Sequence, residues 1–212
     1  MNCHLFLQGD IRIGKSTLIR KAILSYLNDV GGYYVQRIYA NDNPKRYIGF
    51  AVKPVSMKDD YQLNAYVNSL SDVNGLFLYC NQLGIWQQIP GVFTRAAVDY
   101  MNNAILQKKK LIIMDELGGV ELEDIAFSKT VLSILNGDIP VLGVLKLPLN
   151  VQKFKKAAGG KYDIAIEKIQ RIYDEIKNHK KVTVLTLSKT EDFSVETKLL
   201  GFVKGVFDRE KI

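Results

Sequence analysis

The chain has 212 residues, of which 47% are hydrophobic and 24% are charged, and its formal net charge is +7. This balance is ordinary for one globular domain with a sizeable core. No apolar run approaches the roughly 20 residues that a membrane-spanning helix needs, so we expect no membrane partner. The short stretch before Gly9 leaves no room for a secretory signal peptide, which favours a cytoplasmic location.

Apolar periodicity predicts strands and helices along most of the chain. In chain order, the predicted elements are strand 4–8, helix 15–28, strands 33–40, 47–53, 76–80 and 85–89, helix 92–107, strand 111–114, helix 124–135, strand 140–145, helix 163–178 and strand 182–187. Gly31-Gly32 is expected to end the first strand-and-helix unit, and residues 41–46 are predicted to join two paired strands. The segment from Phe193 onward carries no clear pattern.

Uninterrupted apolar strands that are separated by helices are typical of a parallel sheet covered on both faces. We therefore predict an α/β fold of three layers, with a mostly parallel central sheet and a small antiparallel strand pair. Residues 1–212 are predicted to form a single domain. Within it, residues 148–181 are predicted to form either a lid or a basic helical appendage.

Much of the positive charge lies between Lys153 and Lys181. A basic patch attracts polyanions, but no recognisable nucleic-acid motif or interleaved aromatic residues accompany this one, so we do not expect a nucleic-acid partner. Cys3 and Cys80 lie in strand-like apolar contexts and are predicted to be buried thiols. The two histidines lack the spacing of metal ligands.

The first candidate site is a phosphate-binding loop. Gly9, Gly14, Lys15 and Ser16 satisfy the Walker A pattern G-x-x-x-x-G-K-[ST], with a predicted strand before it and a helix after it. In that setting Lys15 neutralises β- and γ-phosphate oxygens, and the hydroxyl of Ser16 coordinates Mg²⁺. The predicted nucleotide-binding residues are Gly9, Asp10, Ile11, Arg12, Ile13, Gly14, Lys15, Ser16 and Thr17.

An acidic pair at the end of a strand supplies the second half of the site. Asp115 follows the apolar run at 111–114, where its carboxylate can reach Mg²⁺ beside Ser16, as in a Walker B motif. Glu116 comes next and is placed to polarise a water molecule for attack on the γ-phosphorus. We therefore predict a nucleoside triphosphate as the ligand, Lys15 and Glu116 as catalytic residues, and Ser16 and Asp115 as metal ligands.

With both halves in place, the chain resembles the small P-loop nucleoside-triphosphatases typified by the cancer-related nucleoside-triphosphatase. The resemblance runs from Leu5 to about Leu147. Its most specific part is DELGGVELEDIAFSKTVLSILNGDIPVLGVLK, which is similar to the family signature DEIGKMEL…F…V…L…PVLGV.

The resemblance implies a three-layer P-loop NTPase fold with a RecA-like core. It also implies hydrolysis of ATP, GTP and other ribonucleoside triphosphates, with low base specificity and a requirement for Mg²⁺. By position, residues 111–118 would be the second nucleotide-contacting segment, in which Gly118 joins Asp115 and Glu116, and Glu116 would be the catalytic carboxylate.

Two positions depart from this family. Arg12 stands in the loop where a glycine is typical, so its side chain must point outward or the loop must be reshaped. Gly119 stands where the family tends to have a lysine. A charge that would act near the triphosphate is thereby missing at that position, and slower turnover is one expected result.

Hydrolysis usually needs one more positive group to stabilise charge on the transferred phosphoryl group. The candidates are Arg12, Arg37, Arg46, Arg95 and Lys146. Among them we select Arg95 as the charge stabiliser, because it begins a helix just before the acidic strand. A guanine-specific signature is absent, since Ser188 to Glu191 reads S-K-T-E.

The residues leave three functions open. The leading one is a Mg²⁺-dependent nucleoside-triphosphatase. A nucleotide or small-molecule kinase would share the loop but needs an acceptor pocket and usually a basic lid. A nucleotide-dependent switch or assembly module would hydrolyse slowly and bind a protein partner, whose identity the residues do not indicate.

Overall fold

The computed structural model describes residues 3–56, 60–147, 165–188 and 192–208. The elements follow one another in this order: β1 (His4–Gly9), α1 (Lys15–Ile23), the 3₁₀ helix η1 (Leu24–Asp29), β2 (Val30–Ala40), β3 (Asn43–Pro54), β4 (Asn64–Val67), η2 (Leu70–Asp72), β5 (Leu76–Cys80), β6 (Trp86–Gln88), α2 (Val92–Leu106), β7 (Leu111–Leu117), η3 (Val120–Glu123), α3 (Ile125–Asn136), β8 (Val141–Leu145), α5 (Ala165–Lys177), β9 (Val182–Leu187) and α6 (Phe193–Phe207).

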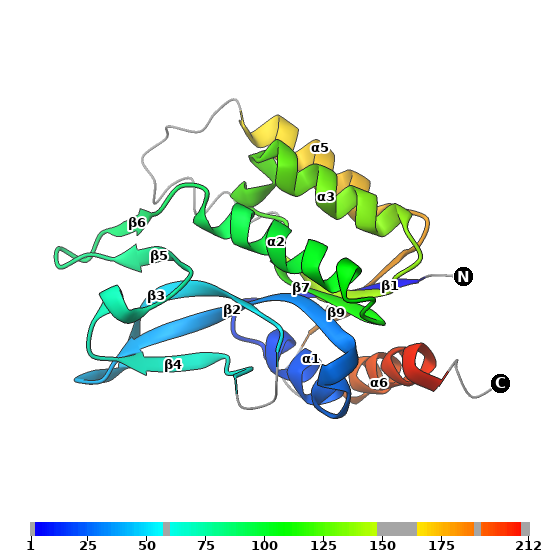
Figure 1. The fold of residues 1–212 in the computed structure, drawn as a ribbon, viewed down its shortest axis with the longest axis horizontal. Coiled ribbons are helices and arrows are strands. Elements are labelled where there is room, and N and C mark those ends of the chain that lie inside the picture. Colours follow the sequence, from blue (N-terminus) through cyan, green and yellow to red (C-terminus); the bar gives the residue numbers. More distant parts are fainter. Residues whose placement is uncertain (1–2, 57–59, 148–164, 189–191, 209–212) are drawn as a thin grey trace.

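Nine strands of the described residues form one sheet in the order β6-β5-β3-β2-β7-β8-β1-β9, with β4 paired to β2 (Figure 1). The run from β2 through β7, β8 and β1 to β9 is parallel throughout. Strands β3, β5 and β6 extend the sheet from β2 in antiparallel pairings. The predicted α/β fold with a mostly parallel sheet is confirmed. The antiparallel part is larger than the one strand pair that was predicted, because it includes β3, β5 and β6 beside β2.

Helices cover both faces of the parallel part, which confirms the three layers. In Figure 1, α2, α3 and α5 lie on one side of the sheet, and α1 and α6 lie on the other. Each face has its own hydrophobic core: Phe6 of β1 packs in the first, and its neighbours Leu5 and Leu7 pack in the second. Because both sides of the strand are buried, its sequence is apolar without alternation.

The second strand begins earlier than predicted. Gly31 and Gly32 do not end a unit; both are buried inside β2. Gly32 has a φ of +97°, and a Cβ there would lie 2.2 Å from the carbonyl oxygen of Ile113 on β7. These glycines therefore let β2 approach its neighbours closely, a role that sequence does not distinguish from that of a turn.

Other boundaries also differ from the prediction. The helix after the phosphate loop is α-helical only to Ile23 and continues as η1. Helix α6 and the short strand β4 were not predicted. Cys3 and Cys80 form no disulfide with described residues and are half-buried, so the prediction of buried thiols is only partly met. Residues 148–164, which are the first half of the predicted lid, lie outside the described residues.

No helix in the described part of the chain is long and apolar enough to cross a membrane.

Candidate active site

The phosphate-binding loop joins β1 to α1 at the carboxyl edge of the sheet. Strand β1 is buried along its whole length, which fixes the start of the loop. Helix α1 begins at Lys15, and its first turn has no acidic side chain. The free backbone N–H groups and the positive end of this helix therefore face the loop, which is the arrangement that binds phosphate.

Lys15 lies across the loop that precedes it. Its Nζ donates hydrogen bonds to the carbonyl oxygens of Gly9 at 2.9 Å and Asp10 at 2.6 Å. Burial lowers the pKa of Lys15, whereas the nearby carboxylates of Glu116 and Asp115 act to raise it. The ammonium group therefore lies between the loop and the acidic pair, where the phosphates of a nucleotide need a positive charge.

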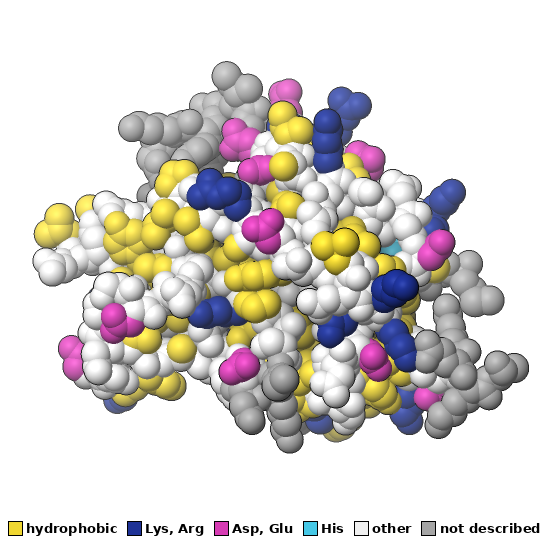
Figure 2. Space-filling view, in the orientation of Figure 1, with side chains coloured by type: hydrophobic (Ala, Val, Ile, Leu, Met, Phe, Trp, Pro, Cys, Tyr) yellow, Lys and Arg dark blue, Asp and Glu magenta, His cyan; other side chains and the backbone are white. Residues whose placement is uncertain are grey.

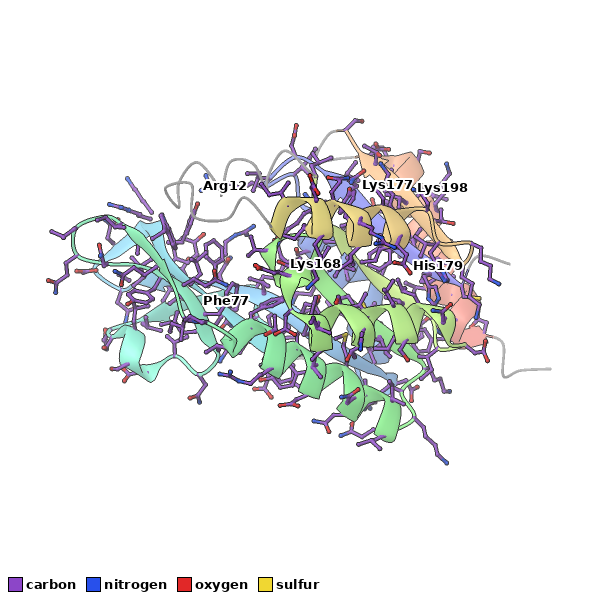
Figure 3. The ribbon with its side chains drawn as sticks, turned by 90° about the horizontal axis from the view of Figure 1, so that it is seen from above. Arg12, Phe77, Lys168, Lys177, His179 and Lys198 are labelled. Atoms are coloured by element: carbon purple, nitrogen blue, oxygen red, sulfur yellow. The ribbon has the colours of Figure 1, made fainter. Side chains whose placement is uncertain are left out.

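The backbone conformation at Arg12 shows why glycine is typical at this position. Its φ is +65°, in the left-handed region that glycine enters without a steric cost. The side chain is exposed, and its guanidinium lies 5.1 Å from the ring centroid of Tyr47 on β3. Figure 3 shows Arg12 on the side of the antiparallel strands, at the end of the molecule away from Lys177, His179 and Lys198. The side chain points outward while the loop keeps its turn.

The remaining loop residues differ in exposure. Asp10, Ile11 and Thr17 are exposed, whereas Ile13 is half-buried against the core on the side of α1. We expect the backbone N–H groups of these residues, and not their side chains, to contact phosphate.

Asp115 and Ser16 meet across the sheet edge. The hydroxyl of Ser16 donates to Oδ1 of Asp115 at 2.9 Å. The other oxygen, Oδ2, is buried and has no hydrogen-bond partner among the described residues. Burial and the neighbouring Glu116 raise the pKa of Asp115 to about 7, against the effect of the Ser16 hydrogen bond. An unsatisfied carboxylate oxygen next to a hydroxyl is a donor set that suits Mg²⁺.

Glu116 follows Asp115 on a distorted stretch of β7. The register between β7 and β8 shifts between Met114 and Leu117, and Glu116 has a φ of +72°. Such a bulge redirects a side chain that a regular strand would place elsewhere. The result is a half-exposed carboxylate beside the buried Asp115.

Lys146 immediately follows β8, the strand that lies between β1 and β7. Its Nζ is 3.6 Å from Oε2 of Glu116 and 3.5 Å from Oε2 of Glu121. Burial lowers the pKa of Lys146, but the two glutamates together raise it above its ordinary value. The ammonium therefore stays charged next to Glu116.

The ends of two side chains occupy the space next to Gly119. Its N–H donates to Oε1 of Glu121 at 2.7 Å. A Cβ at this position would lie 2.6 Å from Oε2 of Glu121 and 3.0 Å from Nζ of Lys146. A positive charge is nevertheless present beside Gly119, on Lys146.

The other arginine candidates are distributed around the site. Arg37 on β2 acts electrostatically on both Lys15 and Asp115. The guanidinium of Arg95 is exposed, and it lies so close to Gly91 that a Cβ on Gly91 would be 2.5 Å from it. Lys146 and Arg37 thus interact with the residues of the candidate site, and the assignment of Arg95 as charge stabiliser stays a prediction.

Gly118 lies behind the acidic pair. It is buried with a φ of +105°, against the ring of Tyr173 on α5. Sequence reasoning did not select Glu121, which is buried and holds both Lys146 and the backbone of Gly119. The signal that could have found it is the E-L that closes DELGGVEL.

No group of three or more His, Cys, Asp or Glu side chains with metal-binding geometry occurs among the described residues. His4 is instead structural: its Nε2 bonds to the carbonyl of Leu135 at 2.9 Å, and its Nδ1 accepts from the N–H of Val141 at 3.1 Å. The metal site that the residues support is therefore the pair Ser16 and Asp115, which needs phosphate oxygens to complete it.

A strand–loop–helix phosphate site, with an acidic strand end that one intervening strand separates from β1, defines a P-loop nucleoside-triphosphatase. Comparison with known proteins agrees. The profile of a family described as NTPase matches residues 4–177. The chain therefore belongs to this family and is an enzyme of the nucleoside-triphosphatase class.

The relatives lie within the same group. The nucleoside-triphosphatase THEP1 of Methanocaldococcus jannaschii is 28% identical over 179 residues, which cover 82% of this chain and 95% of the relative. A solution structure of a human cancer-related nucleoside triphosphatase has a TM-score of 0.58 at 21% identity, covering 98% of this chain and 99% of that one. THEP1 from the hyperthermophile Aquifex aeolicus has a TM-score of 0.56 at 13% identity, covering 95% and 99%. These two structures support the fold.

Proposed function

We propose that this protein is a Mg²⁺-dependent nucleoside-triphosphatase that converts ATP, GTP and other nucleoside triphosphates to the diphosphate and phosphate. The observation that carries the proposal is the hydrogen bond from Ser16 to Asp115 at 2.9 Å, with Lys15 and Glu116 both near enough to interact electrostatically with Asp115. Together these residues provide a phosphate cradle, a metal-binding carboxylate and a carboxylate for the attacking water.

Each side chain has a distinct task in this proposal. Lys15 and the N–H groups at the start of α1 bind the phosphates, and Ser16 and Asp115 hold Mg²⁺. The metal ion, when bound, neutralises charge that develops on the phosphate oxygens. Glu116 orients a water molecule for in-line attack and accepts its proton.

Lys146 acts on Glu116 in this scheme. The ammonium group at 3.6 Å fixes the direction of the carboxylate, and it lies near the negative charge that grows on the γ-phosphoryl group. It therefore takes the place of the lysine that the family tends to have at position 119.

The described residues after β9 supply no guanine-specific contact to this proposal. The hydroxyl of Ser188 donates to Oδ2 of Asp192 at 3.3 Å, at the start of α6. Since this hydroxyl serves the helix cap, we do not assign it to a base.

The test is phosphate release from ATP, GTP, CTP and UTP, each measured with Mg²⁺ and with EDTA. We expect release from all four nucleotides with Mg²⁺ and none without it. Lys15→Ala serves as the control for contaminating phosphatases, because it removes the cradle's charge. Release that persists in EDTA would contradict the metal assignment, and release from one nucleotide alone would contradict the low base specificity.

A further inference from the structure

A cavity of about 620 Å³ adjoins the catalytic edge on the side of the antiparallel strands. Its walls are largely apolar, with Phe50 of β3, Phe77 and Leu78 of β5, and Phe93 of α2. Figure 2 shows hydrophobic side chains gathered over β5 and β6 on this side of the molecule. A cavity of this size matches those that hold small organic ligands. Hydrolysis needs room for one water molecule only, so the volume calls for another occupant.

The charge of the cavity is mostly negative. Its lining includes the carboxylates of Glu116, Glu121, Glu123 and Asp124, and the ammonium of Lys146. These lining residues carry four negative charges and one positive charge. Arg95, whose guanidinium lies beside Gly91 of the lining, and Lys168, whose Nζ donates to the carbonyl of Glu123, add two positive charges outside it, so the surroundings remain negative by one charge. Aromatic rings also attract cations through their faces. The cavity thus favours a positively charged ligand with an apolar body and disfavours an anion.

The position of the cavity separates it from the nucleotide. Its lining contains Glu116 and Lys146 but none of residues 9–17 of the phosphate loop. In phosphoryl transfer, the attacking and leaving oxygens lie roughly in line with the phosphorus between them. Because Glu116 serves the attacking oxygen, the space beyond it lies on the attacking side and the leaving diphosphate lies on the other.

We propose that this cavity is an acceptor site for a small hydroxyl-bearing organic cation with an apolar body, to which the enzyme transfers the γ-phosphoryl group. The inference rests on the proposed function, because it uses the same phosphate loop and the same Glu116. Water takes the place of the hydroxyl when the cavity is empty, which accounts for hydrolysis.

The transfer step balances with the groups already described. The hydroxyl oxygen of the acceptor forms a bond to the γ-phosphorus, and the bond from that phosphorus to the β–γ bridging oxygen breaks. The electron pair leaves with the nucleoside diphosphate, and the hydroxyl proton passes to the carboxylate of Glu116 and then to solvent. The products are a phosphomonoester and a nucleoside diphosphate.

A matched pair of probes tests the class of ligand. The first is 2-amino-1-phenylethanol, which combines a phenyl ring, a hydroxyl and an ammonium group. The second is mandelate, in which a carboxylate replaces the aminomethyl group. Calorimetric titration into the full chain with Mg²⁺ and a non-hydrolysable ATP analogue should show binding of the amine at least about tenfold tighter than that of mandelate. Equal affinities, or no saturable binding of the amine, would overturn the inference.

The second readout follows the phosphoryl group. With Mg²⁺ and ATP, the amine should lower the release of inorganic phosphate, and a new phosphomonoester signal should appear in the ³¹P NMR spectrum. Unchanged phosphate release at a saturating concentration of the amine would show that the bound probe does not reach the attacking position. Displacement of the ATP analogue by the amine would instead make the cavity part of the nucleotide site. Either result would overturn the acceptor assignment.

Two variants locate the binding. Leu78→Trp fills the cavity and should abolish binding of the amine, whereas Leu83→Trp, at an exposed position outside the lining, should not. Glu123→Lys should weaken binding by about fivefold, since it reverses one exposed charge at the rim. The matched reversal Glu175→Lys, on α5 and outside the lining, should leave it unchanged. Binding that survives both cavity variants would contradict the proposal.

Failure of this inference differs from failure of the proposed function. A protein that releases phosphate from nucleotides but binds neither probe keeps the hydrolase and loses the acceptor site. A protein that releases no phosphate and transfers none loses both.

Discussion

The two segments that meet at the catalytic edge reach their shapes in similar ways. In the phosphate loop, Arg12 has a φ of +65°, and in the acidic segment Glu116 has a φ of +72°. Left-handed backbone costs a residue with a side chain about 1–2 kcal/mol. At Arg12 the side chain is turned outward against Tyr47, and glycine would serve the turn as well. At Glu116 the strained backbone holds the side chain beside Asp115 and Lys146. The strained backbone at Arg12 therefore belongs to a residue that glycine could replace. The strained backbone at Glu116 positions the candidate catalytic carboxylate.

The largest effect should come from breaking the acidic segment at Glu116. Glu116→Gln keeps the shape but removes the base, so we expect turnover to fall by about 100- to 10,000-fold while nucleotide affinity is retained. Phosphate release and calorimetric titration measure the two quantities. Glu175→Gln is the matched control, because that glutamate is exposed on α5 and lies outside the cavity. Full turnover by Glu116→Gln would remove it from the mechanism.

The corresponding break in the phosphate loop should appear in binding. Lys15→Ala removes the ammonium that lies across the loop, and we expect triphosphate affinity to fall by about 10- to 100-fold, as for the loss of charged hydrogen bonds. Titration with the non-hydrolysable analogue checks this. Unchanged affinity would count against the whole assignment of the loop.

A smaller effect should follow from Lys146, which connects the two segments. Lys146→Met leaves Glu116 and the buried Glu121 without their ammonium partner, and we expect turnover to fall by about tenfold. Lys129→Met, at an exposed position on α3, is the matched control. If both variants turn over alike, Lys146 has no part in catalysis.

His4, at the start of β1, allows a pH-dependent test of the contacts that hold this strand in place. Burial lowers the pKa of His4, and the nearby Lys181 and His179 also lower it, against the hydrogen bond to Leu135. The unfolded chain therefore binds the proton first, so stability is lost as the pH falls through the ordinary histidine range near 6.5.

His4→Asn keeps a hydrogen-bonding side chain that does not titrate. When the pH falls from 7.5 to 5.5, the free energy of unfolding should decrease by about 1 kcal/mol more in the wild type than in this variant. Thermal unfolding measures the difference. If the free energy of unfolding depends on pH in the same way in both proteins, His4 has the same protonation in the folded and unfolded states.

The smallest effect should separate strain from contact at Arg12. Arg12→Gly and Arg12→Ala both remove the contact with Tyr47, but only glycine fits the left-handed backbone without cost. We expect the glycine variant to be more stable than the alanine variant by about 1 kcal/mol in denaturant unfolding. Equal stabilities would mean that the loop changes its backbone when the arginine is removed.

The phosphate loop could be predicted from sequence because its residues are contiguous and its strand and helix flank it. Asp115 and Glu116 could be found for the same reason. Their geometry could not, because the bulge at Glu116 arises from the register between β7 and β8. A register shift has no local sequence pattern.

The contacts between distant segments were beyond sequence reasoning. Lys146 was a candidate, but its pairing with Glu121 and the space it takes at Gly119 depend on β8 lying between β1 and β7. The cavity depends in the same way on the antiparallel strands. Helix α6 was missed because Gly201 and Gly205 lower its helix propensity.

Positions 119 and 146 are coupled through space. A Cβ at 119 would lie 2.6 Å from Oε2 of Glu121 and 3.0 Å from Nζ of Lys146, so a side chain there makes the ends of these two side chains move. In evolutionary terms, the lysine of this catalytic edge has two alternative positions, one after β7 and the other after β8. We expect relatives with a lysine at the position of Gly119 to lack one at the position of Lys146, so that the two sites covary while the charge near the phosphates is conserved.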